Sequence, residues 1–387
     1  LTDSQRGGVI ALEASTGKER WRAPLARGRG VTLVEHQDTL VVITISAATG
    51  LAIASGEERW SIPMNGILLW HEYVNGLLIC MALESDRDDP ETASVFAIDC
   101  QLGSVAWRAN VTSGAGATAR VVAGTSLWFA SDASGGPRLI EMDMTTGKIV
   151  NDASLAARVM GNMALDSAGS LVLPLMDGTL IIIDPKTLAI RHTLQHGMPA
   201  VRALFVHGTI AALTSQHDGT FIAFDTGSGH RLWELKPKYK ASCSGVWQNG
   251  SAINAVFMAS SKEFHVVSLD MTKGNWRFDT LVAAPKDASI RVLFASATPF
   301  SGGVALMTRR LHSKTEKRNG IQTTVSEWLA PQLFAVDHNT GAICLTYETP
   351  AERSIATSGE SGVEAHSGGL IVNSGGELLY FAGTPGR

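Results

Sequence analysis

Acidic side chains recur in this sequence at one position of a repeated segment, and they are the first candidates for chemistry. Each lies four residues before a turn glycine or the residue that replaces it. Carboxylates repeated in this way could ring a catalytic or metal site, but a catalytic group is usually needed only once. An acid beside a tight turn more often accepts hydrogen bonds from backbone N–H groups. We therefore expect turn-fixing roles for Glu13, Asp99, Asp143, Asp184, Asp225, Asp270 and Asp337.

Other reactive residues do not form a recognised catalytic pattern. His192 and His196 are four residues apart, but they fall in a strand-to-turn segment, where this spacing does not place both on one face. We expect them to be polar surface residues. The cysteines have no CxxC or CxxCH spacing, which argues against zinc, redox and haem sites and favours buried free thiols. The four are Cys80, Cys100, Cys243 and Cys344. The sequence therefore predicts no catalytic, cofactor-binding or metal-binding residue.

The acids belong to a hairpin unit whose first copy runs from Gly8 to Trp21. An alternating apolar run predicts a strand, Thr16 and Gly17 suit a tight turn, and Trp21 lies on the returning strand. Copies follow at intervals of 39 to 47 residues, except for a last interval of 67. The turn position is occupied in order by Gly17, Gly56, Gly103, Gly147, Leu188, Gly229, Gly274 and Gly341.

This period is typical of a four-stranded propeller blade, which spans about 40 to 50 residues. Short apolar strands between the hairpins would supply the two inner strands of each blade. We predict an all-β, eight-bladed β-propeller of four-stranded antiparallel blades that forms a single domain over residues 1–387. Seven complete blades would lie between Gly28 and Thr349, and residues 1–27 and 355–387 would form a composite blade. Pairing of N- and C-terminal strands would close the propeller and remove free edges, although which terminal strand takes the closing position stays open.

Composition excludes several classes of protein. The formal charge of −4 argues against binding nucleic acid through phosphate neutralisation, which requires a strongly basic face. No apolar run reaches the roughly 18 residues that a membrane span needs. The first residues lack the pattern of a signal peptide, so we expect any targeting segment to be absent from this sequence.

The core pattern A-x-D-x-x-T-G-x-x-x-W resembles the pyrroloquinoline-quinone (PQQ) repeat of a family of β-propellers. The resemblance covers nearly the whole chain and implies that tryptophans and turn glycines dock successive blades against one another. A large aromatic residue between sheets supplies apolar burial. The implied docking residues are Trp21, Trp60, Trp107, Trp233 and Trp276 with Gly17, Gly103, Gly147, Gly229 and Gly341.

The resemblance implies two functions. Quinoprotein dehydrogenases of this family hold the quinone and calcium at a central channel, whereas propellers similar to the outer-membrane assembly protein BamB are protein-binding scaffolds. This chain is shorter than those enzymes and lacks their adjacent cysteine pair and any haem motif. We therefore expect a non-enzymatic scaffold without a cofactor, one subunit of a larger assembly in the periplasm or the endoplasmic-reticulum lumen. A PQQ- and calcium-dependent dehydrogenase, or another propeller enzyme that binds a small ligand, is the alternative.

Two insertions interrupt the repeat, at residues 83–94 and 309–328. Both fall between the second and third strands of a predicted blade, so both would emerge on one face. The simpler interpretation is a pair of solvated hairpins, because loops tolerate insertion. Alternatively, one acidic and one basic arm could steer and orient a protein partner. The charged residues of this hypothesis are Asp86, Asp88, Asp89, Glu91, Arg309, Arg310, Lys314, Lys317 and Arg318.

Overall fold

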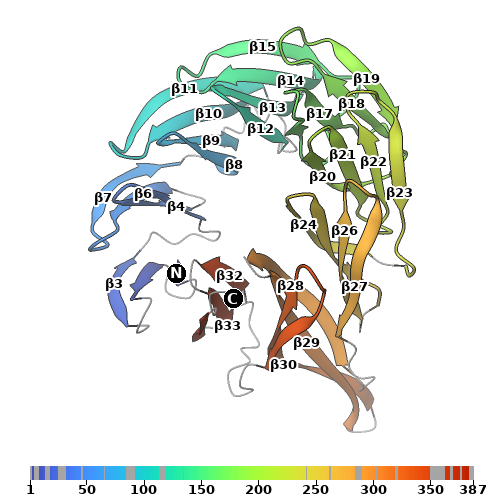
Figure 1. Cartoon of the computed structure of the whole chain (residues 1–387). Coiled ribbons are helices and arrows are strands. Elements are labelled where there is room, and N and C mark those ends of the chain that lie inside the picture. The colour runs from blue at the N-terminus through green and yellow to red at the C-terminus, as the bar shows by residue number, and fades with distance from the viewer. Residues whose placement is uncertain are drawn as a thin grey trace. The chain divides into compact units, whose positions relative to one another are not determined.

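The structure of the chain is a computed structural model (Figure 1). Every regular element in the described residues is a β-strand, as the repeat predicts. The described residues hold no helix long and apolar enough to cross a membrane. They are residues 2–3, 8–13, 18–24, 32–44, 47–64, 66–83, 92–112, 119–133, 135–240, 242–260, 263–283, 290–300, 303–318, 321–348, 362–366, 369–374 and 377–382.

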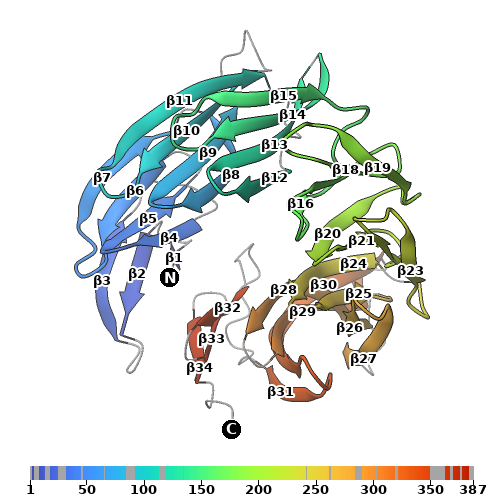
Figure 2. The ribbon, with the colours of Figure 1, turned by 45° about the horizontal axis from the view of Figure 1, so that its top comes forward.

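The chain divides into two compact units, the first of which contains residues 1–165 and 173–191. Its strands pair antiparallel with their neighbours in sequence (Figures 1 and 2). The first sheet contains β1 (Thr2–Asp3), β2 (Gly8–Leu12) and β3 (Glu19–Pro24). The second contains β4 (Thr32–His36), β5 (Thr39–Ile43), β6 (Ala47–Ala52) and β7 (Glu58–Pro63). The third contains β8 (Ile67–Val74), β9 (Leu77–Leu83), β10 (Thr92–Asp99) and β11 (Ser104–Thr112). The fourth contains β12 (Arg120–Ala123), β13 (Ser126–Ala133), β14 (Gly136–Asp143) and β15 (Ile149–Ser154).

The next four-stranded sheet follows the same order. It contains β16 (Ala164–Leu165), β17 (Leu171–Pro174), β18 (Thr179–Ile183) and β19 (Ile190–Gln195).

The second unit contains residues 166–172 and 192–387 and repeats this arrangement. Its sheets are β20 (Val201–His207), β21 (Ile210–Ser215), β22 (Phe221–Asp225) and β23 (Arg231–Leu235); then β24 (Ser242–Asn249), β25 (Ala252–Met258), β26 (Phe264–Asp270) and β27 (Asn275–Ala283). They are followed by β28 (Ile290–Phe300), β29 (Gly303–Arg318), β30 (Ile321–Asp337) and β31 (Ile343–Glu348), and by β32 (Gly362–His366), β33 (Gly369–Ser374) and β34 (Glu377–Ala382). First strands of successive sheets lie together, because β24 contacts β20 and β28, and β28 contacts β32.

Apolar side chains fill the space between neighbouring sheets. In the first unit, Trp70 of β8 packs against Phe129 of β13 with ring centroids 6.0 Å apart. In the second unit, Phe221 of β22 packs edge-on against Phe257 of β25. Middle strands such as β9 and β18 are buried almost along their whole length, whereas last strands such as β15 and β19 alternate between exposed and half-buried positions. In these sheets the middle strands are therefore buried on both faces and the last strand is exposed.

The strands at the two ends of the chain form separate three-stranded sheets among the described residues, β1-β2-β3 and β32-β33-β34. The prediction of a composite eighth blade needs strands from both ends in one sheet. Closure by such a blade therefore stays a prediction.

Tryptophans on the last strands contact turn glycines of the next sheet. A Cβ atom added to Gly56, Gly103 or Gly147 would come within 3 Å of the indole of the preceding sheet. These indoles are Trp21, Trp60 and Trp107, and in the second unit Trp233 is placed in the same way against Gly274. Each glycine also has a positive φ, which disfavours any other residue.

Three predicted docking residues need separate description. Gly341 is contacted by Phe278, four residues after the turn glycine Gly274, and not by Trp276. Trp276 instead packs edge-on against Phe221, with centroids 5.9 Å apart. Gly17 lies outside the described residues. The contacting side chain therefore always follows the turn position of its own hairpin by four residues, but its residue type varies.

We expect the indole contact, rather than backbone conformation alone, to make Gly103 indispensable. Gly124 is a matched control, because its φ of +61° is close to the +65° of Gly103 but no atom lies within 4 Å of an added Cβ. Gly124→Ala should cost about 1 kcal/mol for the left-handed conformation. Gly103→Ala should cost a further ~1–3 kcal/mol, because the Trp60 indole must move. Urea unfolding of the two variants measures the difference, and equal losses would contradict this role of the contact.

Candidate functional site

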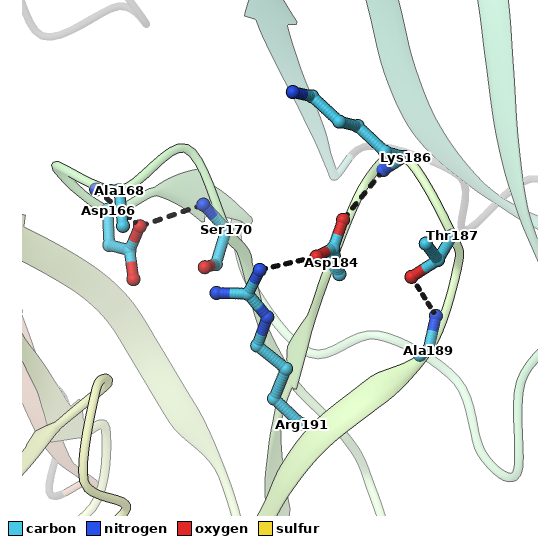
Figure 3. Close-up of polar contacts among 8 residues, drawn as sticks. All are labelled: Asp166, Ala168, Ser170, Asp184, Lys186, Thr187, Ala189 and Arg191. Carbon is cyan, nitrogen blue, oxygen red and sulfur yellow. Dashed lines mark hydrogen bonds and ion pairs between the residues drawn. The ribbon is translucent and has the colours of Figure 1, made fainter.

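The repeated acids lie at the turns between the third and fourth strands. Asp143 Oδ1 accepts hydrogen bonds from the backbone N–H groups of Thr145 and Thr146, at 3.0 and 2.8 Å, and from both threonine hydroxyls. Asp184 accepts the N–H of Lys186 at 3.0 Å and pairs with the Arg191 guanidinium (Figure 3). The carboxylates are thus occupied by their own turns, as the sequence predicts.

Hydrogen bonds to these carboxylates stabilise their charged form. The Thr145 hydroxyl is the main cause that lowers the pKa of Asp143, and Arg191 has this effect on the pKa of Asp184. Similar bonds, led by the Thr209 hydroxyl, the Thr272 hydroxyl and the Thr340 backbone N–H, lower the pKa of three further carboxyls. These are Asp225, Asp270 and Asp337. A carboxylate with a lowered pKa is a poor general base near neutral pH.

A related turn has a buried acid that the repeat pattern does not include. Asp166 is 7% exposed and accepts the N–H groups of Ala168 and Ser170, at 2.9 and 2.8 Å (Figure 3). Its second oxygen accepts the Thr226 hydroxyl at 2.7 Å. Asp166 therefore joins the turn of one hairpin to the chain that follows β22.

The histidine prediction was wrong for His196, which is 4% exposed; its Nδ1 accepts the N–H of Met198 at 3.0 Å. His192 occupies the docking position, four residues after Leu188, and its ring lies against Gly229. Its Nε2 is 3.0 Å from the carbonyl oxygen of Gly227. His192 therefore contacts the turn of the next sheet, whereas His196 is buried directly after β19.

Three of the cysteines are buried, as expected, whereas Cys344 is exposed. Burial raises the pKa of the Cys80 thiol to about 12 and the pKa values of Cys100 and Cys243 to about 11. These thiols stay protonated near neutral pH and are poor nucleophiles.

One cluster of titratable side chains has no signal in the repeat. His265 Nδ1 lies 2.7 Å from Oδ1 of Asp279, and the Tyr239 hydroxyl donates to the same oxygen at 3.1 Å. The Tyr239 ring stacks on His265 with centroids 4.1 Å apart, and burial raises the pKa of its hydroxyl. The cluster holds the segment before β24 against the next sheet. Nowhere in the described part of the chain do three or more His, Cys, Asp or Glu side chains come together in a metal-binding group.

The basic insertion forms an extension of β29 and β30. Residues Arg310–Arg318 pair in continuous register with residues 321–329, as far as Arg318 opposite Ile321. β28 pairs with β29 only up to His312, and β31 pairs with β30 only from Gln332. The described residues beyond His312 thus form a two-stranded ribbon. Lys314 and Lys317 are exposed on it.

The acidic insertion cannot be compared with it. Asp86, Asp88, Asp89 and Glu91 lie outside the described residues. The backbone of Arg309 and Arg318 belongs to β29, and Arg310 is half-buried. A partner-binding role for the two arms therefore stays a hypothesis.

Comparison with known proteins places the chain in a family. The family described as outer membrane protein assembly factor BamB matches residues 5–175 and 91–310, which together span most of the chain. The chain belongs to the BamB family. Its repeats are therefore PQQ-like β-propeller repeats, as the resemblance predicted.

The fold agrees with this membership. The crystal structure of BamB from Moraxella catarrhalis matches with a TM-score of 0.53 and 16% sequence identity, over 77% of this chain and 90% of that chain. At that identity the likeness concerns the propeller fold alone. No curated protein sequence matches this chain.

The turn carboxylates make stability depend on acid pH. Because their folded pKa values are lowered, their stabilisation is fully present above the unfolded pKa of about 3.9 and is lost as pH falls through the lower folded values. Thermal melting between pH 5 and pH 2 should therefore show falling stability. Asp143→Asn should flatten this dependence: the variant should melt at a lower temperature than the parent near pH 7, where the carboxylate is charged, and the two should converge toward pH 2, because an amide oxygen accepts the turn N–H groups about as well as a protonated carboxyl does. An unchanged slope for the variant would contradict a lowered pKa at Asp143.

Proposed function

We propose that this chain is a non-enzymatic, protein-binding scaffold that works as the propeller subunit of a larger assembly outside the cytoplasm. Membership of the BamB family carries the proposal, because the family is described by its part in outer membrane protein assembly. The chemistry of the described residues agrees with it. The repeated carboxylates are occupied by turns, and the buried thiols are protonated.

We further propose that both units belong to one eight-bladed propeller, closed by pairing of the N- and C-terminal strands. The seven four-stranded sheets of the described chain support this number, since the terminal sheets would supply the remaining blade. Closure would protect the edges of the terminal sheets from pairing with other chains.

The β29–β30 ribbon is the first candidate for partner contact. An isolated two-stranded hairpin is only marginally stable in water, so a ribbon of this length gains from contact with another surface. Lys314 and Lys317 are exposed on it, and the sequence adds Arg318 at its tip. Charges at such a rim mainly affect the rate and specificity of association. The acidic residues 86–91 would complete a face with both signs of charge.

Shortening the ribbon tests this proposal without disturbing the sheet. Removal of residues 313–326 and insertion of Asn-Gly would join His312 to Glu327, which already pair across the hairpin. We expect recovery of partners from native extract, quantified by mass spectrometry, to fall at least tenfold. The matched control is Lys314→Glu with Lys317→Glu, which keeps the ribbon and reverses two charges. It should weaken recovery in a salt-dependent way. Full recovery by the shortened protein would refute the proposed role of the ribbon.

A further inference from the structure

An exposed apolar row lies on the last strands of the first unit. The second residue after the turn position is the first residue of β3, β7, β15 and β19 and the second residue of β11. In β3 and β7 this residue and the next one are charged, Glu19–Arg20 and Glu58–Arg59. In β15 they are Ile149 and Val150, which are 45% and 56% exposed. The same position of the repeat therefore changes from charged to apolar along the unit.

The neighbouring strands share this change. Val105 of β11 occupies the position of Ile149 and is 41% exposed, and Ile190 of β19 occupies it with 58% exposure. Leu102, in the turn before β11, is 72% exposed. Single exposed apolar residues are ordinary on protein surfaces, but a recurrent group at equivalent positions indicates an interaction surface.

Contacts between the sheets bring these residues together. Trp107 packs on Gly147 and donates its indole N–H to the Met144 carbonyl at 2.8 Å. Val105 is two residues before Trp107, and Ile149 is two residues after Gly147. The turn between β14 and β15 thus packs against Trp107 of β11, two residues along the strand from Val105.

The spacing between turn positions and contacting residues extends the row to β19. Asn151 follows Gly147 by four residues, the distance at which Trp21, Trp60 and Trp107 follow their own turn positions. The residue at this distance contacts the next turn in those three cases, and by analogy Asn151 would face the turn that contains Leu188. Ile190 is two residues beyond that turn position.

Two exposed lysines lie beside the row. Lys148 precedes Ile149, Lys186 lies in the turn before Leu188, and both are exposed. Neither lysine forms an ion pair with another residue of the described chain. The carboxylates near the row are already engaged: Asp143 by threonines, Asp152 by Arg138 and Asp184 by Arg191. Asp99 accepts the backbone N–H groups of its own turn. An occupant with Asp or Glu beside its apolar side chains would complement this rim.

We propose that this row, formed by Leu102, Val105, Ile149, Val150 and Ile190, docks an apolar segment of a partner protein flanked by acidic residues. The inference rests on the proposed scaffold function and adds a surface in the first unit. A second copy of the chain docked symmetrically through this row would bring Lys148 and Lys186 against the same lysines, so charge disfavours it. The acidic partner segment is favoured because its apolar side chains would cover the row and its carboxylates would pair with Lys148 and Lys186.

Site-specific photocrosslinking in the full chain tests the proposal. The photoreactive p-benzoylphenylalanine replaces Ile190 in the native host, and the crosslinked peptide is sequenced by mass spectrometry. We expect a peptide from another protein that contains apolar residues and carries a net negative charge. The double variant I149E/V150R, which copies Glu19–Arg20, should reduce this crosslink at least tenfold. The same photoreactive residue at Leu281, which is 45% exposed on β27 outside the row, is the control position.

Three results of the crosslinking would overturn the proposal: a crosslink to a second copy of the chain, a crosslink no stronger than at Leu281, or a crosslink unaffected by I149E/V150R. Cosedimentation with phosphatidylcholine vesicles containing roughly one third phosphatidylserine tests a membrane as occupant, and binding that the double variant abolishes would also overturn it. Equal melting temperatures of variant and parent would show that the fold is intact. If the β29–β30 ribbon still recovers partners while Ile190 gives no crosslink, this inference fails and the scaffold function stands.

Discussion

The contact between an aromatic side chain and a turn glycine is the constraint on which the arrangement of neighbouring sheets depends. An indole can lie flat on the next turn only where no Cβ intervenes, and the turn itself needs a positive φ. The indole N–H also needs an acceptor when buried. Trp21 and Trp107 donate to the carbonyls of Ile53 and Met144, each three residues before the contacted glycine. One contact therefore sets the distance between neighbouring sheets and their register, and it also gives the indole N–H a hydrogen-bond acceptor.

Trp60 shows how the constraint adapts when the sequence changes. Its ring packs against Gly103, but its Nε1 has no hydrogen-bond partner among the described residues. A Cβ on Gly50, the residue opposite Trp60 in its own hairpin, would collide with this indole. The corresponding residues opposite Trp21 and Trp107 are Ala11 and Ala97. The missing Cβ at Gly50 thus leaves room for the indole to lie over its own hairpin.

Much of the fold could be predicted because the repeat is recognisable from its turn residues. Glycines and acids marked the hairpins, and the strands follow them. The role of a single residue could be predicted less reliably. The tryptophan of β27 suggested a docking role for Trp276, yet Phe278 makes the contact. Phe278 pairs with Ser268, the residue just before the β-bulge of its hairpin, and Trp233 pairs with Ala223 at the same position of the preceding hairpin. The burial of His196 depends on tertiary packing around β19 and has no signature in strand periodicity. Similarly, the continuous pairing of β29 with β30 cannot be read from a polar insertion that resembles a loop.

Loss of a docking pair and appearance of an exposed apolar surface occur at the same junction. Asn151 replaces the aromatic residue, and Leu188 replaces the turn glycine while keeping a φ of +58°. The two changes fit one another, since a turn that receives no indole does not require a missing Cβ. Asn151 instead donates to Glu141 at 2.5 Å, and Glu141 accepts the Ser126 hydroxyl at 2.6 Å within the same sheet. The sheet thereby satisfies its polar groups internally. Without the docking constraint the start of β15 is free to vary, and it is there that Ile149 and Val150 replace the charged pairs of β3 and β7.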